Sequence, residues 1–139
     1  MPDYSATPLA KKLGIKRGAA VALVGSPEGF RSSLEPLPGE VRIHSRPRSE
    51  LDVIVFFTAQ RAELVRRFES LARTLAPAGG LWVAWPKKAS RTPTDLSFDV
   101  VQGIGLETGL VDNKSCAIDE TWQALRFVYR VEDRKARDN

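Results

Sequence analysis

Short, almost wholly apolar runs alternate with amphipathic segments along this chain, and that alternation constrains the fold more than any other feature. The apolar runs cover residues 19–24, 51–58 and 81–85, and a weaker one covers residues 41–45. Runs without polar alternation are typical of strands buried on both faces of a sheet. Strands separated by helices in this way predict a mainly parallel α/β sheet with right-handed crossovers.

The segments between the strands carry helical signals. Residues 7–14 predict a short helix, and residues 28–37 predict an irregular one. Pro77 and Gly79-Gly80 are expected to end a third helix. That helix has the strongest pattern, a single apolar stripe formed by Leu64, Val65, Phe68, Leu71, Ala72 and Leu75.

The opposite face of this third helix is rich in arginine. Two glutamate-to-arginine pairs, Glu63 with Arg67 and Glu69 with Arg73, stand at i, i+4. Such pairs are typical of a solvated helix face. Most of these arginines are therefore explained as a solvated helix face.

The last third of the chain predicts one more helix and a hairpin. Thr92-Pro93-Thr94-Asp95 has the pattern of a capping box, and an apolar stripe follows it toward Gly109. Residues 110–118 and 122–131 predict two strands. The short connection between them, Asp119-Glu120-Thr121, favours an antiparallel hairpin.

The length of 139 residues suits one domain. We expect residues 1–131 to form a small doubly wound α/β domain of about six strands, mostly parallel, with an antiparallel C-terminal strand. Residues 132–139 are charged and lack an apolar stripe. They are expected to be a disordered tail.

Composition excludes several kinds of site. The chain has no apolar run long enough to span a membrane and no apolar signal region near its start, so a cytoplasmic protein without a membrane partner is expected. Cys116 is the only cysteine and His44 the only histidine, which excludes an intramolecular disulfide and a cysteine-rich zinc site. A nucleophile–base pair of these two residues stays open, although buried structural roles are favoured. No metal site is expected.

Two stretches resemble those around the strands of Rossmann-like methyltransferases: residues 13–24 (LGIKRGAAVALV) and residues 75–83 (LAPAGGLWV). Most of the chain also resembles an uncharacterised bacterial domain-of-unknown-function family of short proteins. Residues 7–15 (TPLAKKLGI), 81–90 (LWVAWPKKAS), 111–114 (VDNK) and 118–122 (IDETW) carry that resemblance. The resemblance implies a methyltransferase-like core.

The chain departs from the methyltransferase pattern where the cofactor would bind. Its first strand is followed by residues 25–30 (GSPEGF), which match neither the G-x-G-x-x-G nor the P-loop pattern. Its second strand ends at Ser45-Arg46, without the acidic residue that holds the ribose of S-adenosylmethionine in that family. One early strand–helix unit is missing as well. The sequence therefore assigns no cofactor.

The carboxyl ends of parallel strands are where ligands bind in such sheets. Two lysines beside hydroxyls and an indole can hold a phosphate or carboxylate, and nearby carboxylates can balance the charge of the lysines. Trp82 and Trp85 fall on opposite faces of one strand and are expected to be core anchors, with Trp122 more exposed. The candidate ligand-binding residues are Ser26, Glu28, Thr58, Lys87, Lys88, Ser90, Asp119, Glu120 and Trp122.

The function expected first is a non-catalytic module, not an enzyme, that binds an unknown small anionic ligand or a protein partner. The alternative is a divergent S-adenosylmethionine-dependent methyltransferase. A second alternative is a basic nucleic-acid-associated protein, because the net charge is +4 and one helix face is rich in arginine. Nucleic acid is not the favoured partner.

Overall fold

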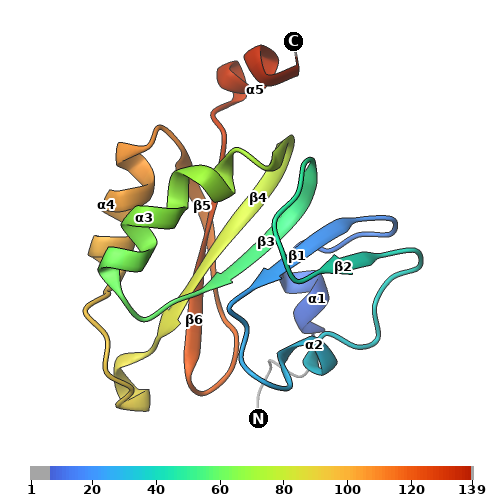
Figure 1. Cartoon of the computed structure of the whole chain (residues 1–139). Coiled ribbons are helices and arrows are strands. Elements are labelled where there is room, and N and C mark those ends of the chain that lie inside the picture. The colour runs from blue at the N-terminus through green and yellow to red at the C-terminus, as the bar shows by residue number, and fades with distance from the viewer. Residues whose placement is uncertain (1–6, 139) are drawn as a thin grey trace.

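The computed structural model describes residues 7–138, which build a six-stranded sheet in the order β2-β1-β3-β4-β6-β5 (Figure 1). The first four strands run parallel, and β6 runs antiparallel to both β4 and β5. This confirms the predicted α/β class with an antiparallel C-terminal strand. The strands are β1 (Ala20–Val24), β2 (Arg42–His44), β3 (Leu51–Phe57), β4 (Leu75–Pro86), β5 (Val111–Ala117) and β6 (Trp122–Val128).

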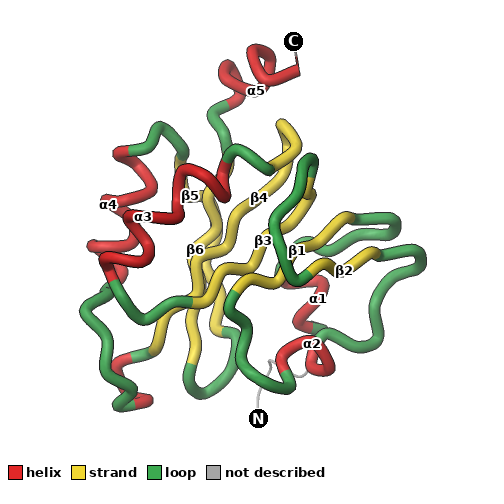
Figure 2. Tube along the Cα trace, viewed as in Figure 1, coloured by secondary structure: helices red, strands yellow, loops and turns green. Residues whose placement is uncertain are grey.

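Helices cover both faces of the sheet (Figure 2). Helices α3 (Arg61–Ala72) and α4 (Phe98–Glu107) pack on one face, and the short helices α1 (Leu9–Lys12) and α2 (Phe30–Ser33) pack on the other. A 3-10 turn, η2 (Lys88–Ser90), follows β4. Each face has its own apolar core, as expected for strands buried on both sides.

The two tryptophans of β4 anchor these two cores. Trp82 lies on the α1 face, and its indole Nε1 donates a hydrogen bond to the Leu13 carbonyl at 3.0 Å. Trp85 lies on the α3 and α4 face. Their opposite faces agree with the period of two along a strand. Both side chains are buried, whereas Trp122 is half-buried, as expected.

Strand β4 begins earlier than the sequence predicts. Pro77 and Gly79-Gly80 were expected to end the preceding helix, yet they lie inside β4, which pairs with β3 from Leu75 onward. A Cβ atom at Gly79 would lie 2.6 Å from the Leu51 carbonyl oxygen. Glycine therefore permits a close approach at the point where the β3–β4 register shifts.

The residues of the expected capping box do not cap α4. Helix α4 begins at Phe98, and the Ser97 Oγ accepts a hydrogen bond from the Val100 N–H. The Thr94 hydroxyl donates to the Ala59 carbonyl at 2.7 Å, and an Asp95 carboxylate oxygen accepts from the backbone N–H that opens α3. These residues therefore tie the loop before α4 to the start of α3.

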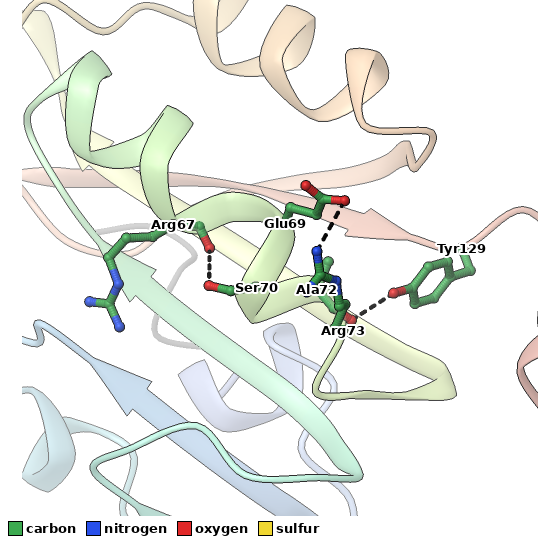
Figure 3. Close-up of polar contacts among 6 residues, drawn as sticks. All are labelled: Arg67, Glu69, Ser70, Ala72, Arg73 and Tyr129. Atoms are coloured by element: carbon green, nitrogen blue, oxygen red, sulfur yellow. Dashed lines mark hydrogen bonds and ion pairs between the residues drawn. The ribbon is translucent and has the colours of Figure 1, made fainter.

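Helix α3 forms one of its two expected ion pairs. Arg73 meets Glu69 at 3.3 Å, as Figure 3 shows. Glu63 instead accepts from the Thr58 hydroxyl, and the Arg67 guanidinium carbon lies 5.4 Å from the centre of the Phe56 ring.

Tyr129, directly after β6, contacts the same helix. The Tyr129 hydroxyl donates to the Ala72 carbonyl at 2.7 Å and fastens the end of β6 to α3 (Figure 3). Beyond it, where residues 132–139 were expected to be a disordered tail, helix α5 (Val131–Asp138) forms. Asn139 lies outside the described residues, as do residues 1–6.

Strand β2 is short and half-exposed, and residues 45–50 return the chain to β3 without a helix. Its last residue, His44, pairs with Ala22, whereas β1 continues to Val24. The chain therefore crosses from β2 over β1 to β3 with no helix in the connection. Within residues 7–138, no helix has the length and apolar character needed to cross a bilayer.

Candidate functional site

The turn of the β5–β6 hairpin lies at the end of the sheet where the parallel strands finish, because Pro86, the last residue of β4, pairs with Trp122, the first residue of β6 (Figure 1). The backbone N–H of Lys87, directly after β4, donates to the Thr121 carbonyl in the hairpin turn at 2.7 Å. The structure therefore brings the loop after β4 beside the acidic turn, as the topology predicts.

A pocket of about 470 Å³ opens between the N-terminal segment, α1 and this hairpin. Three predicted site residues line it: Lys87, Asp119 and Glu120. The remaining lining residues are Thr7, Leu9, Lys12, Ala117 and Ile118. The pocket falls in the size range of small-molecule sites.

Asp119 shapes the turn that presents the pocket's acids. One of its carboxylate oxygens accepts hydrogen bonds from the backbone N–H groups of Thr121 and Trp122, at 2.8 and 2.9 Å. This is an Asx turn, which aspartate favours because its side chain reaches the backbone two residues on. Glu120, at the exposed tip of the turn, makes no such contact among residues 7–134 and lines the pocket.

The two lysines after β4 differ in exposure and in their place relative to the pocket. Lys87 is half-buried and lines the pocket, whereas Lys88 is exposed in η2 and does not. Ser90 serves the loop itself, since its hydroxyl donates to the Lys87 carbonyl at 2.7 Å and accepts from the Thr92 N–H at 3.2 Å. Of this group, Lys87 is the residue that the structure brings to the pocket.

Thr58 is buried at the end of β3 and its hydroxyl serves α3. That hydroxyl donates to Glu63 at 2.5 Å and accepts from the Gln60 N–H at 3.2 Å. A hydroxyl engaged in this way positions the start of the helix and does not point into the pocket.

Ser26 and Glu28 lie on the turn between β1 and α2, outside the pocket lining. Glycines with φ of 68° and 86°, Gly25 and Gly29, flank them. A Cβ at Gly25 would stand 2.9 Å from the Phe57 carbonyl oxygen, so this glycine lets β1 end close to β3.

Trp122 forms part of an aromatic wall on the α1 face. Its ring meets Phe57 edge to face at 5.1 Å between centroids, and Phe57 meets Phe30 at 4.8 Å. Edge-to-face rings at these distances stabilise one another beyond their burial. The wall connects the hairpin to the first turn of α2.

The sequence missed the contribution of the N-terminal segment to the pocket. The pattern over residues 7–14 predicts the helix, and α1 does form there. A local pattern cannot say which end of a sheet a short helix covers, so Leu9 and Lys12 were not nominated.

Cys116 and His44 cannot act together. They lie on β5 and β2, the two outer strands at opposite sides of the sheet. Burial raises the pKa of the Cys116 thiol, and the ammonium groups of Lys12 and Lys114 lower it by less. A nucleophile–base pair of these residues is therefore excluded.

Comparison with known proteins finds its matches among solved structures. No family model matches the chain, and no curated protein sequence matches it. A S-adenosylmethionine-dependent methyltransferase from Aquifex aeolicus matches with a TM-score of 0.63 at 17% identity, over 86% of each chain. DhpI, solved with S-adenosylhomocysteine, matches with a TM-score of 0.61 at 14% identity, over 92% of this chain and 86% of that one.

A larger enzyme matches over part of its length. It is an O-methyltransferase from neocarzinostatin biosynthesis, solved with S-adenosylmethionine and 2-hydroxy-5-methyl naphthoic acid. The TM-score is 0.64 at 12% identity, and the match covers 86% of this chain and 50% of that one. This chain therefore spans about half the length of that enzyme.

These comparisons correct the function expected first. A non-catalytic module that is not an enzyme is the wrong prediction, because the matched structures are methyltransferases, several with S-adenosylmethionine or S-adenosylhomocysteine bound. They favour the alternative, a divergent methyltransferase. The protein has the Rossmann-like α/β fold of the S-adenosylmethionine-dependent methyltransferases.

Proposed function

We propose that this protein is a divergent S-adenosylmethionine-dependent methyltransferase. One observation carries the proposal: the chain, with its antiparallel β6 between β4 and β5, matches a methyltransferase structure over 86% of both chains. Fold alone does not specify chemistry, so the proposal depends on a binding test.

The residues at the usual cofactor end fit S-adenosylmethionine only in part. Gly25 and Gly29 have positive φ angles and no Cβ atom, so the backbone of the β1–α2 turn is open to a ligand at Gly29, while Gly25 lies close to Phe57. Strand β2, however, stops level with Ala22 and is followed by Ser45 and Arg46, so a carboxylate for the ribose hydroxyls is missing there. This end of the sheet therefore lacks the carboxylate that would hold the ribose of S-adenosylmethionine.

Calorimetric titration of the full chain with S-adenosylmethionine tests the proposal. We expect saturable binding, and we expect S-adenosylhomocysteine to compete, since a methyltransferase binds both the methyl donor and its product. Titration with adenosine serves as the control for binding of the nucleoside alone. Absence of saturable heat at millimolar S-adenosylmethionine would overturn the proposal.

Further expectations accompany this function. A small-molecule acceptor suits the chain, because small ligands are named in the matched structures. Three expectations remain predictions: membership of the bacterial family of short proteins, a cytoplasmic location, and a single domain over residues 1–131.

A further inference from the structure

The pocket between α1 and the β5–β6 hairpin carries charges of both signs. Two ammonium groups, from Lys12 and Lys87, and two carboxylates, from Asp119 and Glu120, line the same 470 Å³. Three apolar side chains, Leu9, Ala117 and Ile118, complete most of the wall. The lining therefore has no net charge and one apolar side.

These charges do not all neutralise one another across the pocket. Among residues 7–134, the ion pairs within 4.0 Å are Arg17 with Glu40 and Glu69 with Arg73, both elsewhere. Lys87 and Glu120 thus have no ion-pair partner in that part of the chain. One carboxylate oxygen of Asp119 accepts the hydrogen bonds of the turn, and the other oxygen can accept a hydrogen bond from a ligand.

Charge balance selects the kind of ligand. A polyanion would be held by the lysines and repelled by the two carboxylates at the same time, because like charges at short range oppose binding. A small zwitterion presents a carboxylate to the ammonium groups and an ammonium to the carboxylates, so both sets of charge-assisted hydrogen bonds can form. The apolar side of the pocket then receives an uncharged side chain.

We propose that this pocket binds the α-amino acid group of a small ligand with an apolar side chain. Its carboxylate meets Lys87, and its ammonium meets Glu120, with Asp119 beside it. This chemistry has two sources, a free amino acid or the methionine end of S-adenosylmethionine. The first source is independent of the proposed methyltransferase activity, and the second places part of the cofactor away from the β1–α2 turn.

Calorimetry on the full chain with four probes tests the proposal and separates the sources. L-methionine carries the α-amino acid group alone, and 5′-methylthioadenosine carries the nucleoside of the cofactor without that group. S-adenosylmethionine carries both, and acetate carries a carboxylate alone. We expect L-methionine or S-adenosylmethionine to bind saturably and acetate to bind at least tenfold more weakly.

Matched variants assign the binding to this pocket. Lys87→Ala and Glu120→Gln should each weaken binding of the zwitterionic probe at least tenfold. Lys88→Ala and Glu107→Gln, which remove the same charges from exposed positions outside the pocket, should change it less than twofold. Thermal melting of each variant verifies that the fold is retained, and Glu120→Gln, at an exposed position, keeps the test valid if Lys87→Ala unfolds.

The outcomes separate this proposal from the proposed function. Binding of L-methionine that depends on Lys87 and Glu120 supports a free amino acid as ligand. Binding of S-adenosylmethionine but not of 5′-methylthioadenosine, with the same dependence, supports the methionine end of the cofactor. Equal affinity for S-adenosylmethionine and 5′-methylthioadenosine, unaffected by the variants, would overturn the pocket proposal and leave the methyltransferase standing. Failure of L-methionine and S-adenosylmethionine to bind, or acetate binding as tightly, would also overturn it.

Discussion

The carboxylate of Asp95 accepts a hydrogen bond from the backbone N–H of Arg61 at 2.7 Å, so a residue in the loop before α4 caps the first turn of α3. The first N–H groups of a helix have no partner within the helix, and an aspartate that supplies one stabilises it. Asp95→Ala should therefore lower the free energy of unfolding by about 1 kcal/mol. Urea denaturation measures this change in the free energy of unfolding. Asp95→Asn, whose amide oxygen can accept the same bond, is the control, and equal loss in both variants would contradict the capping role.

Thr58, predicted from its position to bind ligand, should instead prove a positioning residue for α3. Thr58→Val keeps the shape but leaves the Gln60 N–H without its acceptor, at a cost of about 1 to 2 kcal/mol in unfolding free energy. Thr58→Ser restores the hydroxyl and should recover most of that stability. Ligand affinity at the pocket should stay unchanged in both. An unaltered melting temperature with lost affinity would show the opposite role.

Two glycines in α4 should respond to alanine in opposite directions. A Cβ at Gly105 would overlap the Phe127 ring, so Gly105→Ala should destabilise the protein by about 1 to 3 kcal/mol. Gly103 is exposed and has nothing within 4 Å of a Cβ, so Gly103→Ala should stabilise by about 0.5 to 1 kcal/mol. Thermal melting of both variants measures the sign. If both stabilise, α4 does not pack on β6 as described.

Cys116 should react slowly with iodoacetamide in the folded protein. Burial raises the pKa of its thiol, so the thiolate forms at a more alkaline pH than in the unfolded chain. By linkage, the protonated thiol contributes stability in full below the unfolded pKa and loses it as pH rises through the folded pKa. Lys114→Ala, which removes an ammonium that lowers this pKa, should slow the reaction further. Alkylation rates against pH, in native buffer and in urea, measure this, and identical profiles would refute it.

The sheet was predictable because its strands are nearly continuous apolar runs. The start of β4 was not, since Pro77 and Gly79-Gly80 locally resemble a helix stop. Leu75 pairs with Leu51, which makes residues 75–80 part of the strand, and a local sequence pattern does not reveal a pairing between distant residues. Thr94 and Asp95 show the same limit: their sequence indicates a cap, but the capped helix lies 34 residues earlier in the chain.

The candidate site was predictable as far as topology reaches. Parallel strands bring their carboxyl ends to one edge, so the sequence alone predicted that Lys87, Asp119 and Glu120 lie close together. Whether a polar side chain at that edge faces a ligand or its own backbone depends on the local turn. Ser90 and Thr58 are engaged by their neighbours for that reason, and their residue type gave no sign of it.

The shortness of β2 bears on how copies of this chain meet one another. An outer strand displays unpaired N–H and C=O groups and can recruit a strand from another molecule, which is a common route to aggregation. Here that edge is three residues long, with exposed Arg42 and Arg46 and with Pro47 just beyond. The other outer strand, β5, has an irregular register beside exposed Lys114. Both borders of the sheet therefore resist growth into an intermolecular sheet.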